Sequence, residues 1–159
     1  MRNTFSTQFE KRVSGFTLIE VLIALIIMSV GMLGIAGLYV HSMQAGRTSV
    51  FRHNAVTLAG DVADRIRANP RAAASYALAD PMVARVCYTA ATDCTRDDMA
   101  LNDIYLWNLQ ARNTIPNGAV AIVFNNGVNP PTYQITISWT EPGAAPNPSF
   151  SITIPVLGI

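Results

Sequence analysis

One long stretch of apolar sequence limits what this chain can fold into. It runs from Phe16 to Val40, which is 25 residues, and only Glu20 among them is charged. A helix of that length extends about 37 Å, enough to cross the hydrocarbon core of a bilayer with some tilt. A carboxylate inside such a helix costs up to roughly 3 kcal/mol at mid-membrane and less toward the edge. The sequence therefore predicts a membrane helix in which Glu20 needs a compensating partner.

The residues around Glu20 carry a family resemblance. The motif GFTLIE, residues 15–20, follows a basic leader and precedes the apolar run. It resembles the processing site of type IV prepilins and type II secretion pseudopilins. The resemblance implies that a prepilin peptidase cuts between Gly15 and Phe16, and that the new amino-terminal Phe16 is N-methylated.

The same resemblance implies a partner for the carboxylate. In a filament, Glu20 of one subunit pairs with the Phe16 α-amino group of its neighbour. Removing one member of a buried ion pair strands the other, at a cost of about 3–5 kcal/mol. Glu20 is therefore expected to serve subunit assembly.

Two simpler interpretations of the amino terminus compete with this one. A secretory signal peptide fits the basic residues before the apolar run, but the run exceeds the usual 7–15 residues and no A-x-A site closes it. An uncleaved signal anchor shares the topology of a prepilin, so only Gly15 and Glu20 separate the two. The motif in this context favours pilin-like processing.

The length and charge of the chain limit its organisation. With 159 residues, 50% of them hydrophobic and 13% charged, it allows one membrane helix and one small domain. We expect a cleaved leader over residues 1–15, a transmembrane or filament-core helix over 16–40, an amphipathic continuation over 41–69 and a globular head over 70–159. Removing the leader leaves eight basic and nine acidic residues, and nothing in this balance indicates nucleic-acid binding.

The two cysteines lie beyond the membrane helix. Positive-inside orientation places Cys87 and Cys94 in an oxidising compartment, where a disulfide is the expected state. Closing so short a loop stabilises a fold by about 2.5 kcal/mol in the chain-entropy model. Two reduced thiols remain the alternative. Zinc is disfavoured because no second pair of ligands is suitably spaced.

The helical pattern continues past Val40. An apolar stripe with spacings of three and four residues predicts an amphipathic helix that ends at Asn69-Pro70. One helix would then run from Phe16 to Ala68, roughly 80 Å in length. The stripe comprises Phe51, Ala55, Leu58, Val62 and Ile66.

The head combines a helix with strands. Residues 71–93 are expected to be loop with a short helix near 72–78. Thr95 and Asp98 then form a capping-box pattern, before a helix that ends ahead of Ile115 and whose predicted apolar side comprises Leu101, Ile104, Tyr105, Trp107 and Leu109. Strands are predicted over 119–124, 133–140 and 150–156, the last two from strict alternation. The expected fold class is α+β, a pilin-like long amino-terminal helix packed on a small antiparallel sheet.

No catalytic, cofactor or metal site is expected. His41 and His53 are about 120° apart around a helix, so they do not share an ion. Asp93, Asp97 and Asp98 are clustered in the manner of calcium ligands, but helix capping explains the last two more simply. No nucleophile stands beside a base in a known motif, and no Gly-rich phosphate loop is present. The expected mechanism is polymerisation by heterologous helix packing.

The position of the cysteines helps to choose within the family. Major pilins usually close a disulfide near the carboxy terminus, whereas Cys87 and Cys94 lie mid-chain. Together with the motifs at residues 61–69, 107, 116–118 and 137–139, this position resembles the pattern of the type IV pilus modification family of minor pilins. The resemblance implies a partnership with other minor and major pilins and with the inner-membrane assembly complex, in priming a pilus for twitching motility and attachment. The subunit would start in the bacterial inner membrane, with its head in the periplasm, and end in the pilus.

Two other functions stay open. A type II secretion pseudopilin would share the processing site and Glu20. A membrane-anchored periplasmic binding module would instead keep residues 1–15 in the mature protein.

Overall fold

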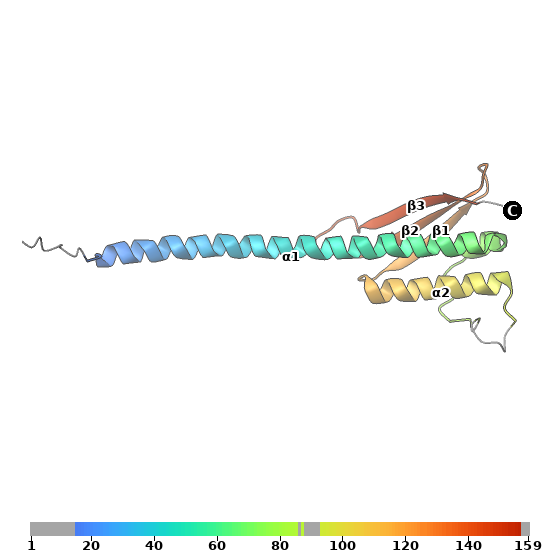
Figure 1. Ribbon diagram of the computed structural model, residues 1–159, viewed down its shortest axis with the longest axis horizontal. Helices are drawn as coiled ribbons and strands as arrows, with labels where there is room; N and C mark the ends of the chain where they lie inside the picture. The colour runs from blue at the N-terminus through green and yellow to red at the C-terminus, as the bar shows by residue number, and fades with distance from the viewer. Residues whose placement is uncertain (1–14, 86, 88–92, 157–159) are drawn as a thin grey trace, which may run out of the picture. The chain divides into compact units, whose positions relative to one another are not determined.

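The computed structural model describes residues 15–85, 87 and 93–156, so residues 1–14 of the predicted leader lie outside the described part. The chain divides into two compact units, residues 1–44 and 45–159. Helix α1 (Leu18–Ala68) contributes to both units (Figure 1). It begins two residues later than predicted, because Thr17 precedes the first turn and its Oγ1 accepts from the backbone N–H of Glu20 at 3.4 Å. Its end at Ala68 confirms the boundary expected from Asn69-Pro70.

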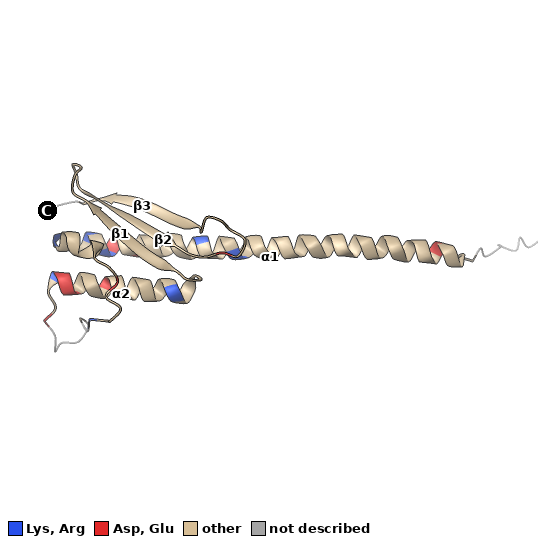
Figure 2. Cartoon of the chain, turned by 180° about the vertical axis from the view of Figure 1, so that it is seen from behind, with Lys and Arg blue, Asp and Glu red and all other residues tan. Residues whose placement is uncertain are grey.

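The described part of the first unit consists of the non-helical residues 15–17 and one helical segment. Every residue from 15 to 44 is exposed, and charge is confined to Glu20 near its beginning (Figure 2). Its largest side chains include Leu33 at 72% exposure and Ile27 at 67%.

The second unit holds a three-stranded antiparallel sheet in the order β1-β2-β3. The strands are β1 (Ala119–Asn125), β2 (Thr132–Ser138) and β3 (Ser149–Pro155). Ile135 of β2 lies opposite Ile122 on one side and Ile152 on the other. The long apolar helix followed by this sheet confirms the α+β pilin-like fold class.

Two further helical elements complete the second unit. The 3₁₀ helix η1 (Pro70–Ala77) follows α1 directly and corresponds to the short helix expected near 72–78. Helix α2 (Arg96–Thr114) lies beside the carboxy-terminal part of α1. It begins with the predicted capping box, in which Thr95 Oγ1 accepts from the Asp98 N–H at 3.1 Å and Asp98 Oδ2 accepts from the Thr95 N–H at 3.3 Å. The Thr95 hydroxyl is also 2.7 Å from Asp98 Oδ2, and the hydrogen bonds that this carboxylate accepts from the Thr95 side chain and backbone lower the pKa of Asp98 below its ordinary value.

The core of the second unit forms between the apolar stripe of α1 and the apolar face of the sheet. The stripe on α1 packs as expected, with its last four positions buried and Phe51 half-buried. The alternating residues of β2 and the residue just after it face the same core, each at most 2% exposed: Tyr133, Ile135, Ile137 and then Trp139. β2 ends two residues earlier than predicted, and Trp139 and Thr140 donate their N–H groups to Pro148 and Pro116 instead of continuing a strand.

The predicted apolar side of α2 was partly wrong. Leu109 is 37% exposed, whereas Asn108 is 4% exposed and belongs to the buried side. Asn108 is buried because both ends of its amide are used. Its Nδ2 donates to the Ile104 carbonyl at 3.0 Å, and its Oδ1 accepts from the Val120 N–H of β1 at 2.9 Å.

A polar network ties α1, η1 and α2 together. Trp107 Nε1 donates to Asp61 Oδ2 at 2.9 Å, and Arg65 pairs with Asp61 at 3.2 Å and with Asp103 at 3.2 Å. Tyr76 donates its hydroxyl to Asp103 at 3.2 Å. Burial, together with the nearby Asp103 carboxylate, raises the pKa of Tyr76 above its ordinary value of 10.0. The network fixes both helices against the same stretch of α1.

Candidate assembly site at the amino terminus

The predicted cleavage residues lie just ahead of α1. Gly15, Phe16 and Thr17 are non-helical and exposed, and the Phe16 side chain is 84% exposed. A Cβ added at Gly15 meets no atom within 4 Å. The packing of the described chain therefore does not require glycine here, so any requirement for it must come from outside this subunit.

Glu20 occupies the third position of α1. Its backbone N–H is capped by Thr17, and it is the acidic residue in the first turn. Aligned peptide dipoles place about half a positive charge at that end of a helix, which favours a nearby carboxylate. Thr17 and Glu20 thus have the spacing of a capping box, although only the Thr17 half of the box is formed here. The sequence contained this signal in the pattern Thr-x-x-Glu ahead of an apolar run.

A shallow apolar groove surrounds the carboxylate. It is lined along one side of the helix by Phe16, Glu20, Val21, Ala24, Leu25 and Met28. Their spacings of one, three and four residues put them on one face. Glu20 is the only member that ionises, so the groove combines an apolar surface with a single negative charge.

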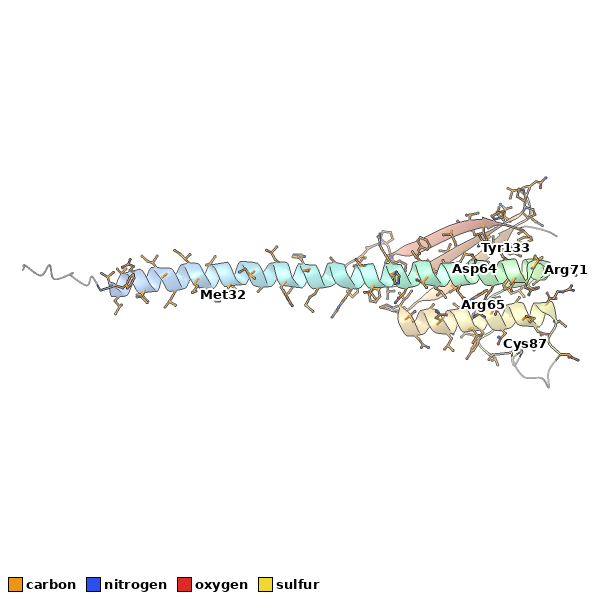
Figure 3. The ribbon with its side chains drawn as sticks, viewed as in Figure 1. Met32, Asp64, Arg65, Arg71, Cys87 and Tyr133 are labelled. Atoms are coloured by element: carbon orange, nitrogen blue, oxygen red, sulfur yellow. A yellow bond between two sulfur atoms is a disulfide. The ribbon has the colours of Figure 1, made fainter. Side chains whose placement is uncertain are left out.

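The rest of this segment exposes apolar side chains all around the helix. Met32, labelled in Figure 3, is 62% exposed, and side chains project outward along the whole segment. By length and composition, α1 is able to cross a membrane. A helix that is apolar on every side must be covered by something other than its own chain, such as lipid or other helices.

The remaining predicted site residues lie in the head or on α1. Cys87 and Cys94 are joined by a disulfide, with their Cα atoms 5.6 Å apart. Cys94 directly precedes the Thr95 cap of α2. His41 and His53 are both exposed. Within the described residues, no three His, Cys, Asp or Glu side chains gather closely enough to hold a metal ion.

Two matches to known families cover adjacent parts of the chain. Residues 11–36 match the prokaryotic N-terminal methylation motif, and residues 37–105 match the family described as type IV pilin Tt1218. No curated protein and no solved structure matches the chain. The first match spans Gly15, Phe16 and Glu20, and together the two extend over more than half of the sequence. Because they join without a gap and the fold is the one expected of a pilin, the chain belongs to the type IV pilin-like family.

Proposed function

We propose that this protein is a minor pilin that takes part in priming and assembling the type IV pilus, and thereby in twitching motility and attachment. The observation that carries the proposal is the amino-terminal segment. It exposes an apolar helix on every side and carries one carboxylate, Glu20, in its first turn beside Phe16.

The first step of the proposed mechanism is processing. A prepilin peptidase in the membrane cuts between Gly15 and Phe16, and Phe16 is then N-methylated. The exposed, non-helical backbone of these residues supports access by a protease. The open space around the Gly15 Cα supports a role for this glycine in fitting the peptidase, because the subunit itself does not need it.

The second step is helix packing. Cleavage leaves a cationic α-amino group on Phe16, and a charge in an apolar setting is costly unless it is paired. The groove around Glu20 offers such a pairing to the Phe16 amine of a neighbouring subunit. A head-to-tail contact of this kind between different surfaces repeats without closing and so generates a helical filament.

The head supports a minor rather than a major subunit. Cys87 and Cys94 close a small loop in the middle of the chain, far in sequence from the carboxy terminus. The stretch from Asp61 to Asn69, together with Trp107 and residues 137–139, resembles the type IV pilus modification protein PilV. Part of this stretch stabilises the head, because Asp61 accepts a hydrogen bond from Trp107 and Arg65 forms an ion pair with Asp103.

The proposed partners and location follow from these steps. The basic leader residues Arg2, Lys11 and Arg12 favour retention of the amino terminus in the cytoplasm. The head would then lie in the periplasm, where the disulfide is stable. From the inner membrane, the subunit would join other minor and major pilins through the inner-membrane assembly complex.

The amino-terminal sequence and intact mass of the membrane-extracted protein from its native host test the proposal. We expect an N-methylated Phe16 start and recovery of the protein in sheared pili. Deletion should reduce piliation and twitching and leave protein secretion unchanged. Loss of secretion with normal piliation would instead select a type II secretion pseudopilin. A start at Met1 would leave a membrane-anchored periplasmic module and remove the filament role.

A further inference from the structure

The sequence contains two Asn-Gly pairs, and the structure puts them in different surroundings. They are Asn117-Gly118, between α2 and β1, and Asn126-Gly127, in the connection from β1 to β2. Asparagine is thermolabile because the backbone nitrogen of the next residue can attack its side-chain amide. Glycine in that next position leaves the nitrogen uncrowded, since it has no side chain. Each pair is therefore chemically able to lose ammonia, and the fold decides which of them does.

The Asn117-Gly118 pair is held by the fold. Gly118 is buried and donates its N–H to the Ile115 carbonyl at 3.0 Å. Asn117 Nδ2 donates to Thr140 Oγ1 at 2.9 Å. A Cβ added at Gly118 would clash with the Ala111 carbonyl oxygen, so the backbone has no room to turn there. The attacking nitrogen and the leaving amide are thus both fixed by hydrogen bonds.

The Asn126-Gly127 pair is packed far less tightly. Residues 125–130 are all exposed, and a Cβ added at Gly127 approaches only the Asn125 side chain, at 3.4 Å. Figure 1 shows this connection projecting beyond the sheet. Within the described residues, no hydrogen bond holds the side-chain amide of Asn126. That amide therefore rotates toward the nitrogen of Gly127 without breaking a contact of its own.

One hydrogen bond restrains the reaction at this second pair. The Gly127 N–H donates to Asn125 Oδ1 at 3.0 Å. Asn side chains commonly form such a turn with the backbone two residues ahead. The nitrogen of Gly127 must leave this acceptor before it attacks Asn126. Because the bond is single and exposed, it slows the attack without preventing it.

We infer that Asn126 is a site of spontaneous deamidation and that the Asn125 side chain limits its rate. The Gly127 nitrogen forms a bond to the side-chain carbonyl carbon of Asn126. The bond from that carbon to Nδ2 breaks, and ammonia leaves with the proton of the Gly127 nitrogen. Water then opens the cyclic imide, adding its hydroxyl to either carbonyl carbon and its proton to the nitrogen. The products are aspartate and isoaspartate.

The reaction changes the charge of this part of the head. The only charged residue after Arg112 is Glu141, and all three strands are uncharged in Figure 2. Either product adds a carboxylate at residue 126, between β1 and β2. Isoaspartate also lengthens the main chain, which an exposed connection accommodates and the packed backbone at Gly118 would not. The inference does not depend on cleavage at Gly15 or on the pilus role.

Ageing the purified full chain in detergent and mildly alkaline buffer compares the two pairs within one molecule. Chymotrypsin cuts after Phe124 and so puts the two asparagines on separate peptides, whose acid and isoaspartate forms are counted by mass spectrometry. In the folded chain, we expect Asn126 to deamidate at least about tenfold faster than Asn117, which has one more hydrogen bond to open. In urea the two rates should converge, because both attacking nitrogens belong to glycine. Equal rates in the folded chain, or a difference that persists unchanged in urea, would overturn the inference.

Asn125 supplies a matched pair of variants. Asn125→Ala removes the acceptor of the Gly127 N–H, and Asn125→Asp keeps it. We expect the alanine variant to deamidate at Asn126 up to about tenfold faster than the wild type, the change that one net hydrogen bond corresponds to. The aspartate variant should react no faster than the wild type. An alanine variant with the wild-type rate would refute the role of Asn125.

A substitution at Gly127 tests which atom attacks. Gly127→Ala crowds the backbone nitrogen with a methyl group that the fold tolerates, because the added Cβ meets only Asn125 Oδ1. We expect the rate at Asn126 to fall severalfold while the circular dichroism spectrum stays that of the wild type. An unchanged rate would indicate direct attack by water on the side chain and would exclude the backbone reaction.

Discussion

Glu20→Ala is the substitution that most directly tests how this subunit enters a filament. In the described structure, the other residues lining the groove around Glu20 are all apolar, including Phe16, Val21 and Leu25. In a filament, water would be excluded from that groove, and a Phe16 amine facing alanine would be a buried charge without its partner. Breaking a buried ion pair from one side costs about 3–5 kcal/mol. At RT of about 0.59 kcal/mol, this lowers incorporation by roughly 160- to 5,000-fold.

The assay compares two pools of the same protein. The variant is expressed in place of the wild type, and the amounts in sheared filaments and in the membrane are measured by quantitative immunoblot. Processing should be normal, because the proposed peptidase site is at Gly15 and the fold of the head does not involve Glu20. We expect abundant mature protein in the membrane and almost none in filaments.

Two matched variants separate charge from packing. Glu20→Asp keeps the negative charge one methylene further back and should incorporate better than Glu20→Ala. Val21→Ala removes apolar contact in the same groove without touching the charge, and truncation of a buried aliphatic side chain of this size costs about 1–3 kcal/mol. It should therefore reduce incorporation less. Wild-type incorporation of Glu20→Ala with normal processing would refute the ion-pair reasoning.

Three further predictions concern processing, the disulfide and pH. Gly15→Leu should leave full-length precursor in the membrane with a normally folded head, since a Cβ there meets nothing; mass spectrometry of a normally cut variant would exclude the peptidase site. Replacing Cys87 and Cys94 by serine should lower the free energy of unfolding by about 2.5 kcal/mol, and denaturant unfolding with an unchanged midpoint would contradict this. Because the pKa of Tyr76 is raised above 10.0, the folded state holds its proton above pH 10 while the unfolded state releases it. The resulting stability is complete below pH 10 and declines as pH rises further. Thermal unfolding of Tyr76→Phe between pH 8 and 11 should show a shallower decline than the wild type, and parallel curves would exclude this role.

The elements predicted correctly are those whose signal is local. The stripe that includes Leu58 and Val62, the alternation around Ile135 and the Thr95 cap each depend on residues a few positions apart, where periodicity and capping act directly. The head fold followed because these patterns left one apolar stripe and one apolar sheet face to cover each other.

The parts not predicted depend on contacts between distant segments. Asn108 reads as a polar position on a helix surface until β1 arrives 12 residues later and presents the Val120 N–H to it. Trp107 was expected in the core from its apolar ring, but its Nε1 bond to Asp61 spans 46 residues. Local spacing carries no information about which distant donor will need an acceptor. The amino-terminal site depends on neither local periodicity nor distant contacts. Gly15 and Glu20 are identified there through a resemblance to a family motif.

The exposed apolar helix by itself does not explain why a subunit would leave the membrane for a filament. Lipid tails cover apolar side chains about as well as neighbouring helices do, so little hydrophobic free energy separates the two environments. The choice must then rest on interactions that lipid does not supply. Glu20 would supply one under the proposed mechanism, because lipid tails offer its carboxylate no cation and the Phe16 amine of a neighbouring subunit would. We therefore expect apolar substitutions along residues 21–40 to change filament entry less than the loss of Glu20, because only Glu20 offers an interaction that lipid cannot replace.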